Sequence, residues 1–112
     1  MERDDSVYLR HILDAIARVE EYLLGVSEEA FHEQCLIQDG VIRQLEIIGE
    51  ATKRLSPGTR ARCPDIPWQD IAGMRDKLIH DYFGVDLEAV WLTACGDVPL
   101  LKAEVARLLV EL

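Results

Sequence analysis

Apolar residues recur at spacings of three and four along most of the chain, a pattern that indicates amphipathic helices. The first such stretch spans residues 5–24, and it is followed by Gly25, a residue type that commonly ends a helix. Ser27 is a favourable N-cap and precedes a second stretch, which continues to about residue 55. The first half of the chain is therefore predicted to form two long helices.

The helical pattern is lost over residues 56–67, where prolines and a glycine predict a loop. Pro67 suits the first position of a helix and precedes a third helical stretch, predicted at residues 71–83. Gly84 is expected to end that helix. No stretch alternates with the period of two that half-buried strands require, so the fold is predicted to be all-α.

A fourth helix is predicted to begin after Asp86, another N-cap residue, and to continue to residue 112. Gly96 and Pro99 could divide it, because an interior proline kinks or ends a helix. The alternation of apolar positions passes through both residues unchanged. It runs over Leu87, Trp91, Ala94, Val98, Leu101, Val105, Leu108 and Leu112. We therefore predict one last helix kinked near Pro99, and an up-and-down four-helix bundle that forms a single domain over residues 1–112.

The composition is that of a folded protein, with 49% hydrophobic and 29% charged residues. No apolar run approaches the roughly 20 residues of a membrane span, and the N-terminus lacks the features of a signal peptide, so a cytoplasmic location is expected. The three cysteines are an odd number without metal-type spacing, which argues against a disulfide framework and against a structural metal site.

The formal net charge of −9 limits how this chain could meet a nucleic acid. Non-specific binding to nucleic acid depends on cationic side chains that neutralise phosphates. Any RNA recognition must therefore be local, and a basic surface on a partner is compatible with the overall charge.

The segment over residues 73–83 has the densest set of chemically useful side chains. Arg75 offers a permanent charge and a planar donor fork for phosphate oxygens, and His80 can exchange a proton near neutral pH. On one helix these two residues would point roughly 140° apart and lie about 7.5 Å apart along the axis, so convergence needs the reach of arginine or a second copy across a two-fold axis. Asp76, four residues before His80, could orient the imidazole. The alternative is that these are ordinary surface charges beside a half-buried histidine.

The second helix has a polar stripe opposite its apolar one, formed by Asp39, Arg43, Glu46, Glu50 and Lys53. One interpretation is a solvated helix face. The other is that Asp39, Arg43 and Glu50 border an active groove.

The pattern Arg75-x-x-x-x-His80-x-Tyr82 resembles the signature of the HepT toxins, a branch of the HEPN superfamily of helical RNases. The resemblance extends over nearly the whole chain. Further matching segments are Ile48-Gly49-Glu50-Ala51, Pro67-Trp68, Ile71-Ala72-Gly73-Met74, Val85-Asp86-Leu87 and Val90-Trp91. Asp76 stands where the family commonly has Asn, which leaves its orienting role open.

This resemblance implies a homodimeric, metal-independent endoribonuclease toxin with no cofactor of its own. His80 would transfer the proton, and Arg75 would stabilise the transition state. It also implies an antitoxin of the minimal nucleotidyltransferase type, which uses ATP to attach AMP to Tyr82. The alternatives are a catalytically silent HEPN scaffold that only binds such a partner, and a plain dimeric bundle without RNA activity.

Overall fold

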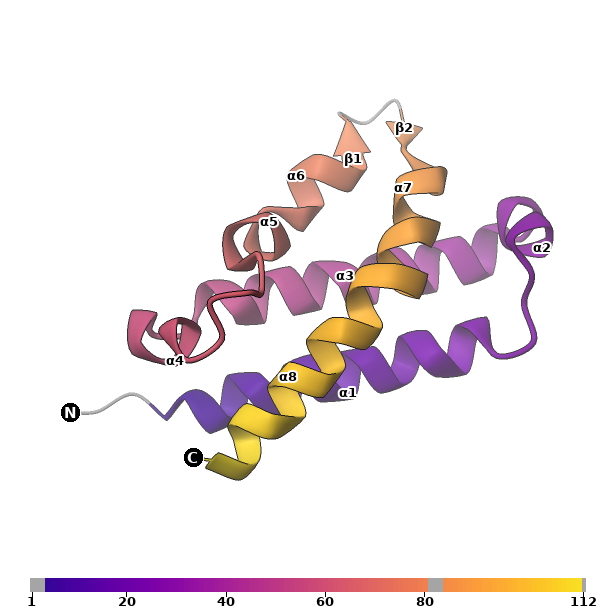
Figure 1. The fold of residues 1–112 in the computed structure, drawn as a ribbon. Helices are drawn as coiled ribbons and strands as arrows, with labels where there is room; N and C mark the ends of the chain where they lie inside the picture. The colour runs from indigo at the N-terminus through magenta and orange to yellow at the C-terminus, as the bar shows by residue number, and fades with distance from the viewer. Residues whose placement is uncertain (1–3, 81–83, 112) are drawn as a thin grey trace.

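The protein is built predominantly from helices in the computed structural model (Figure 1). The structure describes residues 4–80 and 84–111, with the backbone only at residues 75, 77, 79 and 80. The first half contains α1 (Asp5–Leu23), α2 (Glu28–Glu33), α3 (Cys35–Lys53) and α4 (Pro57–Ala61). The second half contains α5 (Trp68–Ala72), α6 (Met74–Leu78), β1 (Ile79–His80), β2 (Gly84–Val85), α7 (Leu87–Leu92), the π-helical segment η2 (Thr93–Asp97) and α8 (Val98–Glu111).

The core lies where α1, α3 and α8 meet. Figure 1 shows α1 and α3 side by side in opposite directions, with α8 crossing in front of α1. The apolar positions that predicted these helices are the ones they bury against each other. The most deeply buried are Leu9, Ile12, Ile16, Val41, Leu45, Ile48, Leu101, Val105 and Leu108. The helix periodicity read from the sequence therefore places the core correctly.

The first predicted helix boundary is confirmed. α1 ends at Leu23, and Gly25 follows with a φ of 72°, the left-handed conformation that glycine adopts without strain. The backbone N–H of Val26 closes the turn by donating to the carbonyl of Leu23 at 2.9 Å.

The second predicted helix is interrupted, so the prediction of one continuous helix from Ser27 to about residue 55 is wrong. Ser27 caps α2 as expected, but Gln34 is extended and separates α2 from α3. The interruption accompanies a fully buried Phe31, whose ring centroid lies 5.4 Å from that of Trp91. The Gln38 side chain donates to the carbonyl of Phe31 at 2.8 Å, which satisfies a backbone group at the end of α2.

The predicted loop over residues 56–67 contains the short helix α4. Ser56 caps it, and Pro57 occupies its first turn. The buried carboxylate of Asp5 accepts hydrogen bonds from the Ser56 backbone at 3.1 Å and from the Ser56 and Thr59 hydroxyls at 2.5 Å. These contacts join residues more than 50 positions apart, so tertiary structure holds α4 against the start of α1.

The third predicted helix, over residues 71–83, is wrong in its extent. The chain forms α5 and α6 on either side of Gly73, and α6 ends at Leu78. The backbone N–H of Asp86 donates to the Leu78 carbonyl at 2.9 Å, and a short antiparallel pair follows, with Ile79 opposite Val85 and His80 opposite Gly84. Gly84 therefore lies in β2 and does not end a helix.

The last helical run is continuous from Leu87 to Glu111, as predicted, but its special feature is a π-helical turn. The Val98 N–H donates to the carbonyl of Thr93, five residues earlier, just before Pro99. Proline supplies no N–H and crowds the carbonyl four residues before it, and a π turn is one way a helix accommodates such a disruption. Figure 1 shows the run changing direction between α7 and α8.

The fold is thus helical, as predicted, but a simple up-and-down set of four helices does not describe it. In the described parts of the chain, α5 and α6 are short helices that pack on α3 where one longer helix was expected. None of the helices that the structure describes is long and apolar enough to cross a membrane.

Candidate functional site

The segment with the predicted catalytic residues runs from α6 into β1. Arg75 lies in the first turn of α6, and His80 lies in β1, where its backbone is paired with Gly84. Because the helix ends between Arg75 and His80, the separation calculated for a continuous helix does not apply. Buried Met74 and Leu78 anchor α6 on the core, while Asp76 is exposed. Tyr82 lies outside the described residues.

A close approach of two backbones sets the position of this segment on α3. A Cβ atom added at Gly49 would lie 3.0 Å from the carbonyl oxygen of Ile71 and 3.5 Å from that of Ala72. Only glycine accommodates this contact without displacement of the last turn of α5. Gly49 thereby fixes how close α5, and α6 after it, come to α3.

A cavity of about 250 Å³ lies between α3 and the α5–α6 segment, and we call it the α3–α6 cavity. It is lined by Arg43, Glu46, Gly49, Glu50, Lys53, Ala72, Gly73 and Asp76. The structure therefore brings Arg43 and Glu50 of the polar stripe together with Asp76 of the motif segment. Asp39, the third stripe residue expected there, is exposed and does not line this cavity. The functional roles of these residues stay predictions.

The ionic contacts at the rim of the α3–α6 cavity are weak. Glu50 lies 3.9 Å from the Lys53 ammonium and 3.8 Å from the Arg54 guanidinium, and all three side chains are more than half exposed. Exposed ion pairs of this kind stabilise a fold by roughly 0–1 kcal/mol. These ion pairs therefore contribute little to holding Glu50, Lys53 and Arg54 in fixed positions.

A second hollow of about 250 Å³ lies between α1 and α3, and we call it the α1–α3 hollow. Its lining comprises Tyr8, His11, Arg43, Glu46, Ile47, Glu50, Ala51 and Arg54. Arg43, Glu46 and Glu50 line both depressions. Sequence reasoning gave His11 no role, because its proximity to Arg43 arises only when α1 packs against α3.

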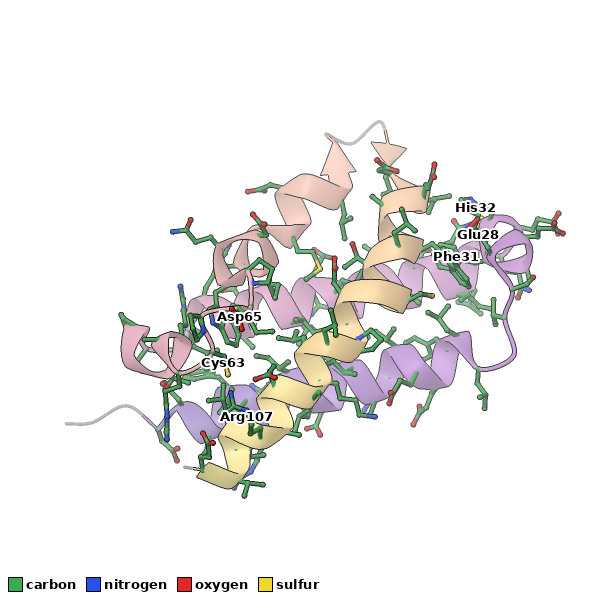
Figure 2. The ribbon with its side chains drawn as sticks, viewed as in Figure 1. Glu28, Phe31, His32, Cys63, Asp65 and Arg107 are labelled. Carbon is green, nitrogen blue, oxygen red and sulfur yellow. The ribbon has the colours of Figure 1, made fainter. Side chains whose placement is uncertain are left out.

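Cys63 is the centre of a separate polar cluster between the segment before α5 and α8, where Figure 2 shows it close to Arg107. The Arg107 guanidinium donates to its sulfur at 2.7 Å, and the thiol donates to the Glu104 carboxylate at 3.1 Å. Burial raises the pKa of the Cys63 thiol, and the hydrogen bond to Glu104 acts in the same direction. The cluster connects the segment before α5 to α8 through these two hydrogen bonds.

In the parts of the chain that the structure describes, no group of three or more His, Cys, Asp or Glu side chains is arranged to hold a metal ion.

Comparisons with known proteins identify a matching family and several relatives. The family described as "Ribonuclease HepT-like" matches residues 12–108. A Thermococcus cleftensis protein described as a probable ribonuclease HepT is 44% identical over 108 residues, which are 96% of this chain and 98% of that protein. A Caldanaerobacter subterraneus protein described as a putative RNase is 42% identical over 102 residues, or 91% of each chain.

A third relative is a longer protein that this chain matches over part of its length. The Methanocaldococcus jannaschii protein described as a gamma-glutamylcyclotransferase and putative RNase is 45% identical over all 112 residues. The present chain spans 50% of its length. No solved structure matches the chain significantly.

The matched region includes α3, α6 and β1, the elements that bear the candidate site. The family match and these relatives define a predominantly helical protein of the ribonuclease class. The chain belongs to the HepT-like ribonuclease family.

Proposed function

We propose that this protein is an endoribonuclease whose catalytic residues are Arg75 and His80. The observation that carries the proposal is the family match over residues 12–108, a region that contains both Arg75 and His80. Asp76 lines that cavity and lies one position after Arg75 in α6, where it is proposed as an orienting residue.

The proposed reaction needs only groups that the chain and the RNA supply. His80 removes the proton of an RNA 2′-hydroxyl, whose oxygen forms a bond to the adjacent phosphorus. The bond from phosphorus to the 5′-oxygen breaks, and an imidazolium returns a proton to that oxygen. The products are a 2′,3′-cyclic phosphate and a 5′-hydroxyl. Arg75 stabilises the charge that develops on the phosphoryl oxygens, a contribution that is often the largest one in catalysis.

The proposed active form is a homodimer with two facing motif segments. A two-fold interface places the same patch on both subunits, so α6 and β1 would be present twice in one groove. Two imidazoles could then share the base and acid roles across that groove. What supports this proposal is that α6 ends at Leu78, before His80. Arg75 and His80 therefore do not share one face of a single helix.

The proposed biological role is that of a toxin in the cytoplasm, neutralised by a minimal nucleotidyltransferase antitoxin. That partner would use ATP to attach AMP to Tyr82, which is next but one to His80 in the sequence. The added phosphodiester would bring negative charge and bulk to the motif segment and repel RNA.

Cleavage of RNA in the presence of EDTA tests the catalytic proposal. We expect His80→Ala to reduce the rate by roughly 10²–10⁴-fold, the usual contribution of a general acid or base. His32→Ala is the matched control, because His32 is exposed on α2 and lies outside both depressions. Unchanged cleavage and unchanged growth arrest in His80→Ala would refute the proposed chemistry.

Intact mass after incubation with the partner nucleotidyltransferase and ATP tests the regulation. The wild-type protein should gain the mass of AMP, and the Tyr82→Phe variant should not. Equal gain by both proteins would place the modification on another residue.

The second candidate is a silent scaffold that binds the nucleotidyltransferase without cleaving RNA, and the net charge of −9 favours it. The same assays separate the two functions. A scaffold would bind the nucleotidyltransferase, and neither the wild-type protein nor His80→Ala would cleave RNA.

A further inference from the structure

The α1–α3 hollow and the α3–α6 cavity adjoin along one helix. They share Arg43, Glu46 and Glu50, which form an exposed to half-buried ridge on α3. Ile47 and Ala51 line only the first depression, whereas Gly49 and Lys53 line only the second. At about 100° per residue these two pairs project from opposite sides of the ridge. A chain-like ligand in the α3–α6 cavity can therefore cross the ridge into the α1–α3 hollow.

The side chains of the hollow suit a nucleotide. The rings of Tyr8 and His11 meet edge to face, with centroids 6.2 Å apart and planes at 85°. Tyr8 is half-buried and His11 is exposed, so this aromatic pair forms part of the wall and remains accessible. Arg43 and Arg54 add two guanidinium groups to the same hollow. Aromatic faces stack on bases and guanidinium groups bind phosphates, which is the usual combination for single-stranded RNA.

The charge of this surface differs from that of the whole chain. The two depressions are lined by three basic residues, Arg43, Lys53 and Arg54, and three acidic residues, Glu46, Glu50 and Asp76. The lining of the two depressions is therefore formally neutral, whereas the chain carries a net charge of −9. An RNA strand meets less repulsion here than the overall charge implies.

We propose that the α1–α3 hollow is an RNA subsite that binds a nucleotide next to the one held in the α3–α6 cavity. Tyr8 stacks on its base, Arg54 and His11 contact its phosphate, and Arg43 lies between the two subsites. This inference rests on the proposed function and assigns binding residues that the motif segment does not contain. The substrate is accordingly single-stranded RNA that extends beyond the scissile dinucleotide.

Fluorescence anisotropy with a labelled eight-nucleotide single-stranded RNA tests the subsite, with His80→Ala as the background that keeps the RNA intact. Tyr8→Leu should raise Kd about tenfold, the scale of one stacked base, while Tyr8→Phe retains the ring and the affinity. Arg54→Ala should raise Kd. It should also reduce the slope of log Kd against log salt concentration by about the contribution of one phosphate contact. Because Arg54 is largely exposed, this second variant keeps the test valid if Tyr8→Leu fails to fold.

Arg18→Ala is the matched control for Arg54→Ala, because Arg18 is an exposed cation on α1 that lines neither depression. His32→Ala is a second control, because His32 is exposed on α2 and lines neither depression. Both controls should bind within twofold of the background. Equal affinities for Tyr8→Leu, Arg54→Ala and the background would overturn the inference, as would an equal loss in Arg18→Ala.

Substrate length separates failure of the subsite from failure of the proposed function. With His80 restored, Tyr8→Leu should slow cleavage of the eight-nucleotide RNA but leave dinucleotide cleavage unchanged. If cleavage of both the eight-nucleotide RNA and the dinucleotide required His80 but was unchanged by Tyr8→Leu, only the subsite proposal would be refuted. If the wild-type protein did not cleave RNA but its RNA binding still depended on Tyr8 and Arg54, only the proposed chemistry would be refuted.

Discussion

The contact at Gly49 gives the sharpest stability prediction, because two effects of opposite sign act at one residue. Gly49 lies inside α3, where Gly→Ala by itself favours the helix by roughly 1 kcal/mol. The added methyl would lie 3.0 Å from the carbonyl oxygen of Ile71, which belongs to the backbone of α5 and cannot rotate away as a side chain could. Overpacking of this kind costs about 1–3 kcal/mol.

The net effect predicted for Gly49→Ala is a loss of up to about 2 kcal/mol in the free energy of unfolding. Gly96→Ala is the matched control, because a Cβ atom there would meet nothing within 4 Å. It should stabilise the protein by about 1 kcal/mol, the same helix-propensity gain that acts at Gly49. The two variants should therefore differ by roughly 1–3 kcal/mol, or about 0.5–2 M in the urea midpoint.

Urea unfolding followed by far-UV circular dichroism measures this difference. RNA cleavage measured well below the midpoint adds a second readout, because α5 must shift by a few tenths of an ångström and α6 follows it. We expect Gly49→Ala to lose activity while Gly96→Ala keeps it. Equal midpoints for the two variants would refute the close packing of α5 on α3, and with it the argument that Gly49 positions the motif segment.

Three other predictions concern groups away from the candidate site. Asp5→Ala removes the acceptor of three hydrogen bonds from the first turn of α4, and we expect a loss of roughly 1–3 kcal/mol in chemical denaturation; an unchanged midpoint would contradict this network. The hydrogen bond from Arg107 lowers the pKa of Glu104, so this carboxylate stabilises the fold above its unfolded pKa and the contribution is lost as pH falls through the folded value. Stability should therefore fall less for Glu104→Gln than for wild type between about pH 5 and pH 3, and parallel profiles would exclude the linkage. Thiol labelling should modify exposed Cys35 readily in the native protein and buried Cys63 only on unfolding, because burial raises the pKa of Cys63; rapid native labelling of Cys63 would argue against the hydrogen-bonded cluster.

The sequence predicted the helices that have a continuous apolar stripe and clear ends. The stripe of α1 ends at Gly25, and the stripe of the last run passes through Pro99, so the extents of both followed from local rules. The interruptions at Gln34 and Leu78 could not be predicted in this way. Gln34 allows Phe31 to enter the core, and Leu78 accepts a hydrogen bond from Asp86, so both depend on residues outside the local helix pattern.

In the candidate site, too, some features followed from local sequence and others only from tertiary contacts. Arg43 and Glu50 were predicted from helical spacing, and the structure brings them to one cavity with Asp76, a residue of a different helix. Asp39 shares the polar stripe, but it lies outside that cavity, because α5 and α6 pack along another part of α3. His11 had no partner pattern in the sequence, since its neighbours come from α3.

The sequence by itself determined the helical class, the core positions on α1, α3 and α8, and the motif that indicated the HepT-like family. Helix periodicity and capping act over a few residues, so one sequence is enough to read them. Only the tertiary structure decided where the helices break, how α5 and α6 dock on α3, and which charges share a cavity. Those features depend on contacts between residues far apart in the chain, such as Gly49 with Ile71 and Asp5 with Thr59, which local patterns do not encode.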